Sequence, residues 1–76
     1  MKPTIGRMVV YRQPERESPV NGTRFHPAVI TRVWGHDIVN LTVFFDTHPP
    51  RPVPSVLHTC DAAEHVAAWD WPARET

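Results

Sequence analysis

Residues 38–45 form the stretch that most constrains the fold, because they make a long apolar run that neither proline nor glycine interrupts. β-branched and aromatic residues fill most of the run, and these residue types fit the pleated surface of a sheet better than a helix. Asn40 and Thr42 alternate with apolar residues, which is typical of a strand with one buried face. The residues expected on that buried face are Val39, Leu41, Val43 and Phe45. The run is therefore predicted to be the central strand of a β-domain.

The length of 76 residues suits a single domain, residues 1–76, with a modest hydrophobic core. The chain has one cysteine, so neither a disulfide framework nor paired cysteines for a structural zinc ion can reinforce so small a fold. Self-association is the remaining way to bury more apolar surface. We therefore expect a homo-oligomer.

The charge of the chain bears on its partners and its location. Eight basic and eight acidic residues give a formal net charge of zero, so the long-range field that attracts the phosphate backbone of DNA or RNA is missing. No segment approaches the run of about 18 apolar residues that a membrane helix needs. We expect no bulk nucleic-acid binding, no membrane contact and a cytoplasmic location in which Cys60 stays reduced.

The first strand is predicted at residues 7–12. Its alternation leaves two arrangements open. Either Met8 and Val10 face the core, or Val9 and Tyr11 do. Periodicity alone does not decide between them.

A second strand is predicted at residues 27–34, after a long surface loop over 13–25 that contains two prolines and an Asn-Gly pair. Residues 35–37, Gly-His-Asp, turn the chain directly into the central strand, which predicts an antiparallel hairpin. One face of this second strand would carry Ala28, Ile30, Arg32 and Trp34, and the other Val29, Thr31 and Val33. Because both faces are partly apolar, we expect a barrel wall or a neighbouring subunit to cover each of them.

The C-terminal third completes the predicted fold. Residues 53–58 can form a short fourth strand, which Pro54 restricts to an edge. Residues 62–68 are rich in helix formers and predict one or two helical turns. Residues 69–72, Trp-Asp-Trp-Pro, predict a fifth strand or a packed tail with both indoles on one side. The fold class is thus mainly β: a small, strongly bent antiparallel sheet or an SH3-like barrel of about five strands, with a short helical turn near the C-terminus.

Three groups of residues could carry chemistry, but each has a simpler interpretation. Several metal-capable residues lie close together, yet their spacing is not that of a zinc site: His58, Cys60, Asp61, Glu64 and His65. Cys60 lacks an identifiable orienting group or oxyanion motif, so we predict no catalytic residue, no enzymatic activity, no metal and no cofactor. Residues 48–54 are proline-rich and resemble ligands of aromatic-grooved domains, although a stiff loop is the simpler interpretation.

Arginines and aromatic residues recur together near the predicted strands, and seven of the eight basic residues are arginine. Planar guanidinium groups bind phosphate oxygens in pairs, and aromatic rings stack on bases with about 1–3 kcal/mol per base. The candidate ligand-binding residues are Arg7, Tyr11, Arg12, Arg32, Trp34, Trp69, Trp71 and Arg74. The alternative is that the tryptophans belong to the core and the arginines cover them as solubilising cations.

Four segments of the chain resemble a group of small uncharacterised proteins of bacteriophages and prophages. The typical members show the patterns G-R-x-V-x-Y, P-A-x-x-x-x-V-W, V-N-L-x-V-F and W-x-W-P-x-R, which correspond here to residues 6–11, 27–34, 39–44 and 69–74. The chain departs from the group at Val10, where many members have histidine. It also has Ala67-Ala68 before Trp69, where many have a Gly-Thr pair.

The resemblance implies a phage context, in which small proteins commonly oppose host defence. We therefore expect a non-enzymatic anti-defence protein that binds and sequesters a small nucleotide-derived immune signal in the cytoplasm of the infected host. This expectation from the phage context is an analogy and not a property of particular residues. The alternative is a protein-protein interaction module that inhibits or scaffolds a host or phage protein through its apolar strand face or its proline-rich loop.

Overall fold

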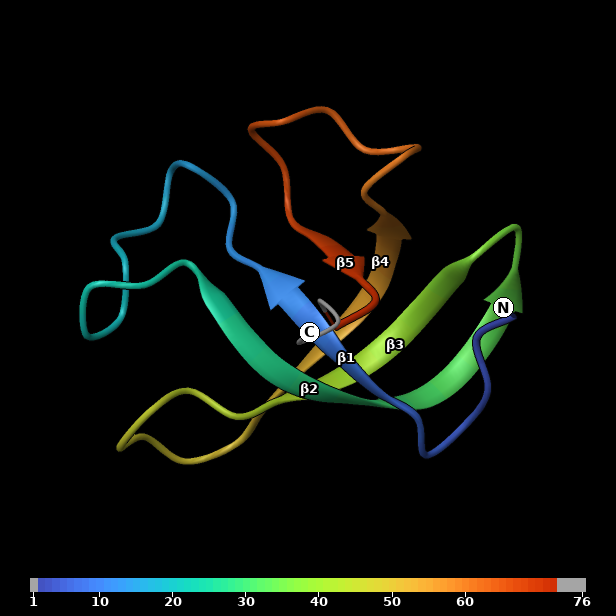
Figure 1. Ribbon diagram of the computed structural model, residues 1–76, viewed down its shortest axis with the longest axis horizontal. Helices are drawn as coiled ribbons and strands as arrows, with labels where there is room; N and C mark the ends of the chain where they lie inside the picture. The colour runs from blue at the N-terminus through green and yellow to red at the C-terminus, as the bar shows by residue number, and fades with distance from the viewer. Residues whose placement is uncertain (1, 73–76) are drawn as a thin grey trace, which may run out of the picture.

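The computed structural model describes residues 2–72 and contains five strands that close into a barrel in the order β1-β2-β3-β4-β5 (Figure 1). The strands are β1 (Met8–Arg12), β2 (Phe25–Gly35), β3 (Ile38–Val43), β4 (Arg51–His58) and β5 (Ala68–Asp70). The mainly β, five-stranded barrel predicted from the sequence is confirmed. Among the described residues, no helix is long and apolar enough to span a membrane.

The β2–β3 hairpin forms as predicted around a tight turn at His36 and Asp37. Both residues have positive φ angles, 50° and 60°, which matches a two-residue turn whose twist suits the flanking strands. Gly35 precedes them at φ 119°, a backbone conformation that other residues adopt only with strain. This turn marks one end of the barrel, called here the hairpin end.

The barrel closes through one parallel pair, which the expectation of an antiparallel sheet did not include. β5 runs antiparallel to β1 but parallel to β4, with Leu57 opposite Ala68 and His58 opposite Trp69. Residues 59–67 cross over one end of the barrel between β4 and β5 (Figure 1), so the chain re-enters the sheet in the same direction. The antiparallel arrangement that the sequence favoured therefore holds for the other four strand pairs and not for this one.

The crossover contains two separate turns where the sequence predicts helical turns over residues 62–68. Ala62 N donates to His58 O at 3.0 Å, and Val66 N donates to Ala63 O at 3.2 Å, but no helix forms among the described residues. A stretch of this length is too short to hold a helix by itself. Here the carbonyl oxygens of Ala63 and Val66 accept hydrogen bonds from the Arg12 guanidinium instead, at 2.8 and 2.9 Å.

Arg12 is thus a structural tether, and its replacement by lysine should loosen the crossover. Both hydrogen bonds come from one guanidinium nitrogen, Nη2, and an ammonium group keeps the charge but loses the rigid planar geometry that holds this nitrogen in place. We expect faster amide hydrogen exchange in residues 59–67 of Arg12→Lys, with unchanged exchange in β2 and β3. Arg16→Lys, which changes an exposed arginine in the loop after β1, is the control, and equal exchange in both variants would contradict the tether.

The core lies inside the barrel, and alternate residues of the strands fill it. On β1 the buried pair is Val9 and Tyr11, which settles the ambiguity left by the sequence. On β3 and just beyond it the predicted face is confirmed, because the four expected residues are at most 7% exposed. The buried hydrophobic residues are Val9, Tyr11, Ala28, Ile30, Val39, Leu41, Val43, Phe45, Val56, Ala68 and Trp69.

β2 departs from simple alternation because two bulges interrupt its pairing with β3. The register shifts between Ile30 and Arg32 and again between Val33 and Gly35. Each bulge inserts one extra residue, which reverses the side-chain direction beyond it. Val33 therefore packs against the same core as Ile30, and the predicted shared face of Ala28, Ile30, Arg32 and Trp34 is wrong beyond Ile30. The apolar residues of β2 thus need less outside cover than the alternation suggested.

Asn40 holds the bulges of both neighbouring strands. Its side-chain oxygen accepts hydrogen bonds from Trp34 Nε1 and from the backbone N–H of Ser55, both at 2.9 Å. Ser55 has a positive φ of 54° and lies where the β3–β4 register shifts. Pro54 sits at the same irregularity, and β5 pairs only with residues beyond it. β4 is therefore an inner strand rather than the predicted edge strand, since the missing N–H of Pro54 falls outside the regular pairing.

Candidate functional site

Two of the predicted ligand-binding residues belong to the core. Tyr11 is 2% exposed and Trp69 is fully buried. Trp69 Nε1 donates to the carbonyl oxygen of Asp37 at 2.8 Å, so the indole closes the hairpin end from inside. Tyr11 and Trp69 therefore serve the core rather than a ligand, because neither ring presents a free face. Arg12 tethers the crossover, and Arg74 lies outside the described residues.

Arg7 and Trp71 are brought together at the hairpin end. The Arg7 guanidinium carbon lies 5.4 Å from the centroid of the Trp71 ring, which is within the range of a cation–π contact. Trp71 is half-buried and packs edge-on against Trp69, with ring centroids 5.1 Å apart and an interplanar angle of 87°. The predicted arrangement of both indoles on one side of the last segment therefore holds, but only Trp71 reaches the surface.

Arg32 and Trp34 form a second stacked pair on the hairpin. The Arg32 guanidinium carbon lies 3.9 Å from the Trp34 ring centroid, and the Trp34 side chain stays 54% exposed. The bulge of β2 and the hydrogen bond to Asn40 fix the indole on the outer surface. This pair presents a cation and an exposed aromatic ring together.

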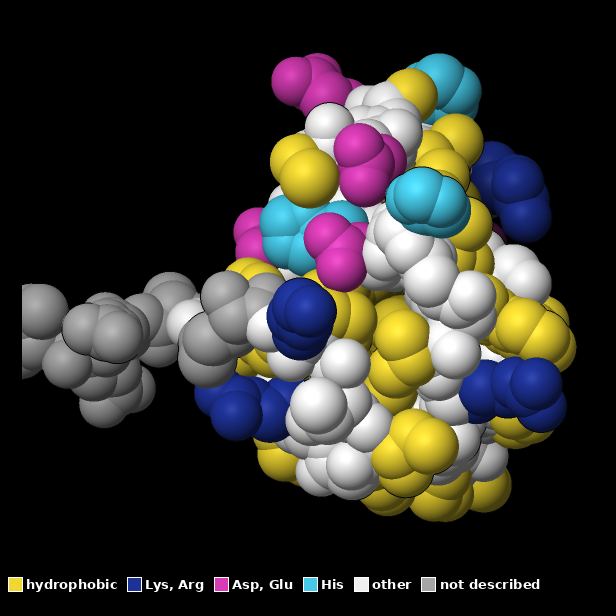
Figure 2. Space-filling model, turned by 90° about the vertical axis from the view of Figure 1, so that its right-hand side faces the viewer, with side chains coloured by type: hydrophobic (Ala, Val, Ile, Leu, Met, Phe, Trp, Pro, Cys, Tyr) yellow, Lys and Arg dark blue, Asp and Glu magenta, His cyan; other side chains and the backbone are white. Residues whose placement is uncertain are grey.

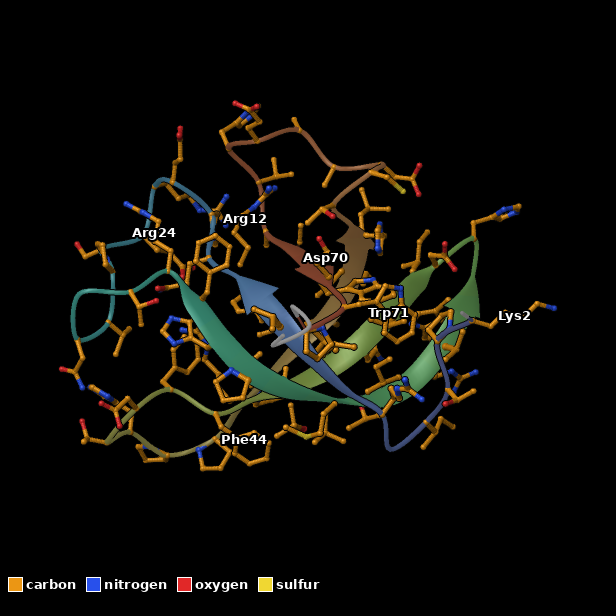
Figure 3. The ribbon with its side chains drawn as sticks, in the orientation of Figure 1. Lys2, Arg12, Arg24, Phe44, Asp70 and Trp71 are labelled. Carbon is orange, nitrogen blue, oxygen red and sulfur yellow. The ribbon has the colours of Figure 1, made fainter. Side chains whose placement is uncertain are left out.

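A hollow of about 250 Å³ lies at the hairpin end. It is lined by residues of the N-terminal segment and the hairpin: Lys2, Pro3, Val33, Gly35, His36 and Asp37. Lys2 and Trp71 lie on the same side of the barrel (Figure 3). The face seen in Figure 2 carries basic side chains on both flanks of hydrophobic ones in its lower half. The lining of the hollow combines one basic residue, Lys2, with one acidic residue, Asp37.

The opposite end of the barrel holds a polar cluster that the sequence analysis missed. His26 and Gln13 are buried, at 2% and 4% exposure, and their side chains form a hydrogen bond of 2.9 Å. Arg51 lies 4.6 Å over the Phe45 ring and pairs with Glu17 at 3.5 Å. A hollow of about 240 Å³ opens beside this cluster, between Phe45 and Arg51. Its members lie far apart in sequence, and no local pattern marks them.

His26 should make the stability of the protein depend on pH. Burial, and then the positive charge of Arg51, lower the pKa of His26 below its usual value. The unfolded chain therefore binds this proton more tightly than the fold does, and stability is lost as the pH falls below about 6.5, the ordinary histidine pKa. We expect urea-unfolding midpoints to fall from pH 7.5 to pH 5, and to fall less in His26→Gln. An identical pH dependence in the variant would contradict this assignment.

The outer face of β1, β2 and β3 is apolar and open. Met8 pairs with Val29 across the strands, and Phe44 N donates to the carbonyl oxygen of Pro27. Because their neighbours in sequence are buried, these side chains point outward, and Met8 and Phe44 are 48% and 39% exposed. Phe44 projects away from the barrel in Figure 3. Phe25 belongs to the same outer face, where Phe25 and Phe44 both line a hollow of about 550 Å³.

The described residues contain no group of three His, Cys, Asp or Glu side chains arranged to hold a metal ion. In comparisons with known proteins, the chain matches no protein-family model, no curated protein and no solved structure. Function must therefore be argued from the geometry of this chain.

Proposed function

We propose that this protein binds a small nucleotide-derived ligand at the hairpin end without transforming it. The observation that carries the proposal is the Arg7 guanidinium over the half-buried Trp71 indole. A hollow to which Lys2 contributes lies at the hairpin end and supports the proposal. An indole offers a stacking surface for a base, and guanidinium and ammonium groups attract phosphate. Following the resemblance to phage proteins, the ligand class is a nucleotide immune signal of the host, and binding opposes defence by sequestering it.

The size of the hollow limits what one subunit encloses. Ligand sites for molecules of drug size usually measure about 300–1,000 Å³, whereas this hollow measures about 250 Å³. It fits a base or a ribose rather than a whole dinucleotide. Val33 and Gly35, which line the hollow, are the sequence neighbours of Trp34. The stacked pair of Arg32 and Trp34 therefore extends the surface beyond the rim of the hollow.

The direct test is recovery of an intact ligand. Purified protein is incubated with a panel of cyclic mono- and dinucleotides and ADP-ribose derivatives, washed free of excess, and heat-denatured. Mass spectrometry of the supernatant should then return one ligand class unchanged. Recovery of a cleaved product would show an enzyme, and recovery of nothing from the whole panel would remove the nucleotide proposal. Arg51→Lys, which alters a stacked arginine at the other end of the barrel, should retain the ligand.

A second function, the inhibition or scaffolding of another protein, is favoured by the apolar outer face of β1, β2 and β3. Exposed apolar surface of this kind marks interaction sites in small soluble proteins. The residues that make up the face are uncharged: Met8, Phe25, Pro27, Val29 and Phe44. The chain also has a net charge of zero, so two copies can meet here without repulsion between like charges. We propose a second copy of the chain as the first occupant of this face.

Assembly can be measured directly by multi-angle light scattering. We expect a mass that is a multiple of 8.7 kDa, and we expect Met8→Glu to lower it because burial of an unpaired carboxylate is costly. Glu64→Gln, on the exposed crossover, should leave the assembly unchanged. A monomer of the native chain at micromolar concentration would remove the self-association proposal, while ligand recovery would still test the hairpin end.

A further inference from the structure

A cysteine, a histidine and an aspartate meet beside the crossover, where the aspartate directly precedes Trp71, and none of the three belongs to the proposed Arg7–Trp71 site. His58 ends β4, Cys60 lies two residues later in the turn, and Asp70 ends β5. His58 Nδ1 lies 3.0 Å from Cys60 Sγ, and His58 Nε2 lies 3.3 Å from Asp70 Oδ1. The imidazole therefore stands between the thiol and the carboxylate.

The contacts of His58 define its proton positions and its orientation. Nδ1 also accepts the backbone N–H of Cys60 at 3.1 Å, so it is the unprotonated nitrogen, and Nε2 carries the proton toward Asp70. The ring packs edge-on against the buried Trp69, with centroids 4.6 Å apart and an interplanar angle of 85°. Nδ1 is thus held ready to accept the proton of the thiol.

Asp70 is held in place in turn. Its Oδ2 accepts the Thr59 hydroxyl at 3.0 Å, and its Oδ1 accepts the backbone N–H of Trp71 at 2.8 Å. The parallel pairing of β4 with β5 brings Asp70 to His58, although twelve positions separate them in sequence. A nucleophile, a base and a group that orients the base are the arrangement that activates a thiol.

The surroundings of Cys60 make assistance by a base necessary. Cys60 is exposed, and partial desolvation together with the carboxylates of Asp61 and Asp37 raises the pKa of its thiol. The resting group is therefore a thiol, whereas only the thiolate attacks. A thiol of raised pKa yields a stronger nucleophile once its proton has been removed.

We propose that Cys60 is a site of thiol–disulfide exchange with small disulfides, with His58 as its base and Asp70 as the residue that positions His58. His58 Nδ1 takes the thiol proton as Cys60 Sγ attacks one sulfur of the disulfide. A bond forms between Cys60 and that sulfur, the disulfide bond breaks, and the released thiolate recovers the proton from His58. The products are a mixed disulfide on Cys60 and one free thiol, with no further oxidant required.

Charge determines which disulfides react fastest. The carboxylates of Asp37, Asp61 and Asp70 surround the thiol and its base, and acidic and histidine side chains gather in the upper half of the face in Figure 2. Negative surroundings concentrate cations and repel anions. The substrate class is therefore a cationic disulfide, and cystamine should react faster than dithiodipropionate, an anion of similar size.

The experiment measures the rate of mixed-disulfide formation by mass spectrometry at pH 7 and low ionic strength. Each rate is divided by the rate of the same chain unfolded in urea, which removes intrinsic differences between the two reagents. We expect the native chain to react with cystamine at least about 100-fold faster than the unfolded chain, the low end of assistance by a general base. The normalised preference for cystamine over dithiodipropionate should shrink in 1 M salt.

Variants separate the roles of the three residues. His58→Asn should bring the cystamine rate down to that of the unfolded chain, and Asp70→Asn should lower it less, while His65→Asn on the crossover leaves it unchanged. A native rate no higher than the unfolded rate overturns the proposal, and so does a folded His58→Asn variant that reacts as fast as the native chain. If the His58 and Asp70 variants do not fold, the comparison of native with unfolded chain still decides.

Discussion

Replacing Leu41 with alanine is expected to lower the free energy of unfolding by about 2–5 kcal/mol, the range for truncating a buried leucine. Leu41 is 1% exposed and pairs with Ile30 on one side and Val53 on the other. Because β3 lies between β2 and β4, the surrounding strands cannot collapse into the space left behind. The cavity would therefore remain, and its cost adds to the lost transfer energy of the side chain.

A loss of this size is a large fraction of the total free energy of unfolding of a chain of 76 residues, because folded proteins have roughly 0.05–0.15 kcal/mol per residue. Urea unfolding of Leu41→Ala and Val43→Ala measures it. Thr42→Ala, on the outer face of the same strand, is the control and should cost less than about 1 kcal/mol. Equal midpoints in all three variants would show that the inner face of β3 does not hold the barrel together.

The parts of the fold that local rules govern were predictable. Strict alternation over residues 38–45 identifies the buried face of β3, and the short turn after Trp34 identifies its hairpin with β2. Bulges are different, because an inserted residue leaves no mark on composition. The one at Thr31 reverses the side chains up to the next bulge, so Val33 rather than Arg32 meets the core. The parallel closure of β4 on β5 depends on the path of the crossover, which no local signal specifies.

The candidate site likewise contains features that local sequence rules predict and features that depend on long-range pairing. The sequence associates arginines with tryptophans, and the structure brings together two such pairs, Arg7 with Trp71 and Arg32 with Trp34. The sequence also allows the tryptophans to belong to the core, but it does not indicate which of them does, and the structure buries Trp69. The group that orients His58 was also beyond local reasoning, because Asp70 approaches it only through the pairing of two strands.

Arg7→Lys and Trp71→Phe are each expected to weaken binding of the nucleotide-derived ligand while the barrel stays folded. Lysine keeps the positive charge at the hairpin end but loses the planar pair of N–H donors that binds two phosphate oxygens at once. Phenylalanine keeps an aromatic ring against Trp69 but offers less surface to a stacked base. Since a stack contributes about 1–3 kcal/mol, its complete loss corresponds to about 5- to 150-fold in affinity, and partial loss in Trp71→Phe should give about tenfold.

Calorimetric titration with the ligand recovered in the heat-release assay measures both effects. Arg51→Lys is the matched control, because Arg51 also lies over an aromatic ring, Phe45, but at the opposite end of the barrel. If Arg7→Lys and Trp71→Phe both bind as tightly as the native chain, the arginine and tryptophan of the hairpin end are only covering the core. The apolar outer face would then carry the function, since a flat protein interface is far less sensitive to guanidinium geometry at one distant residue.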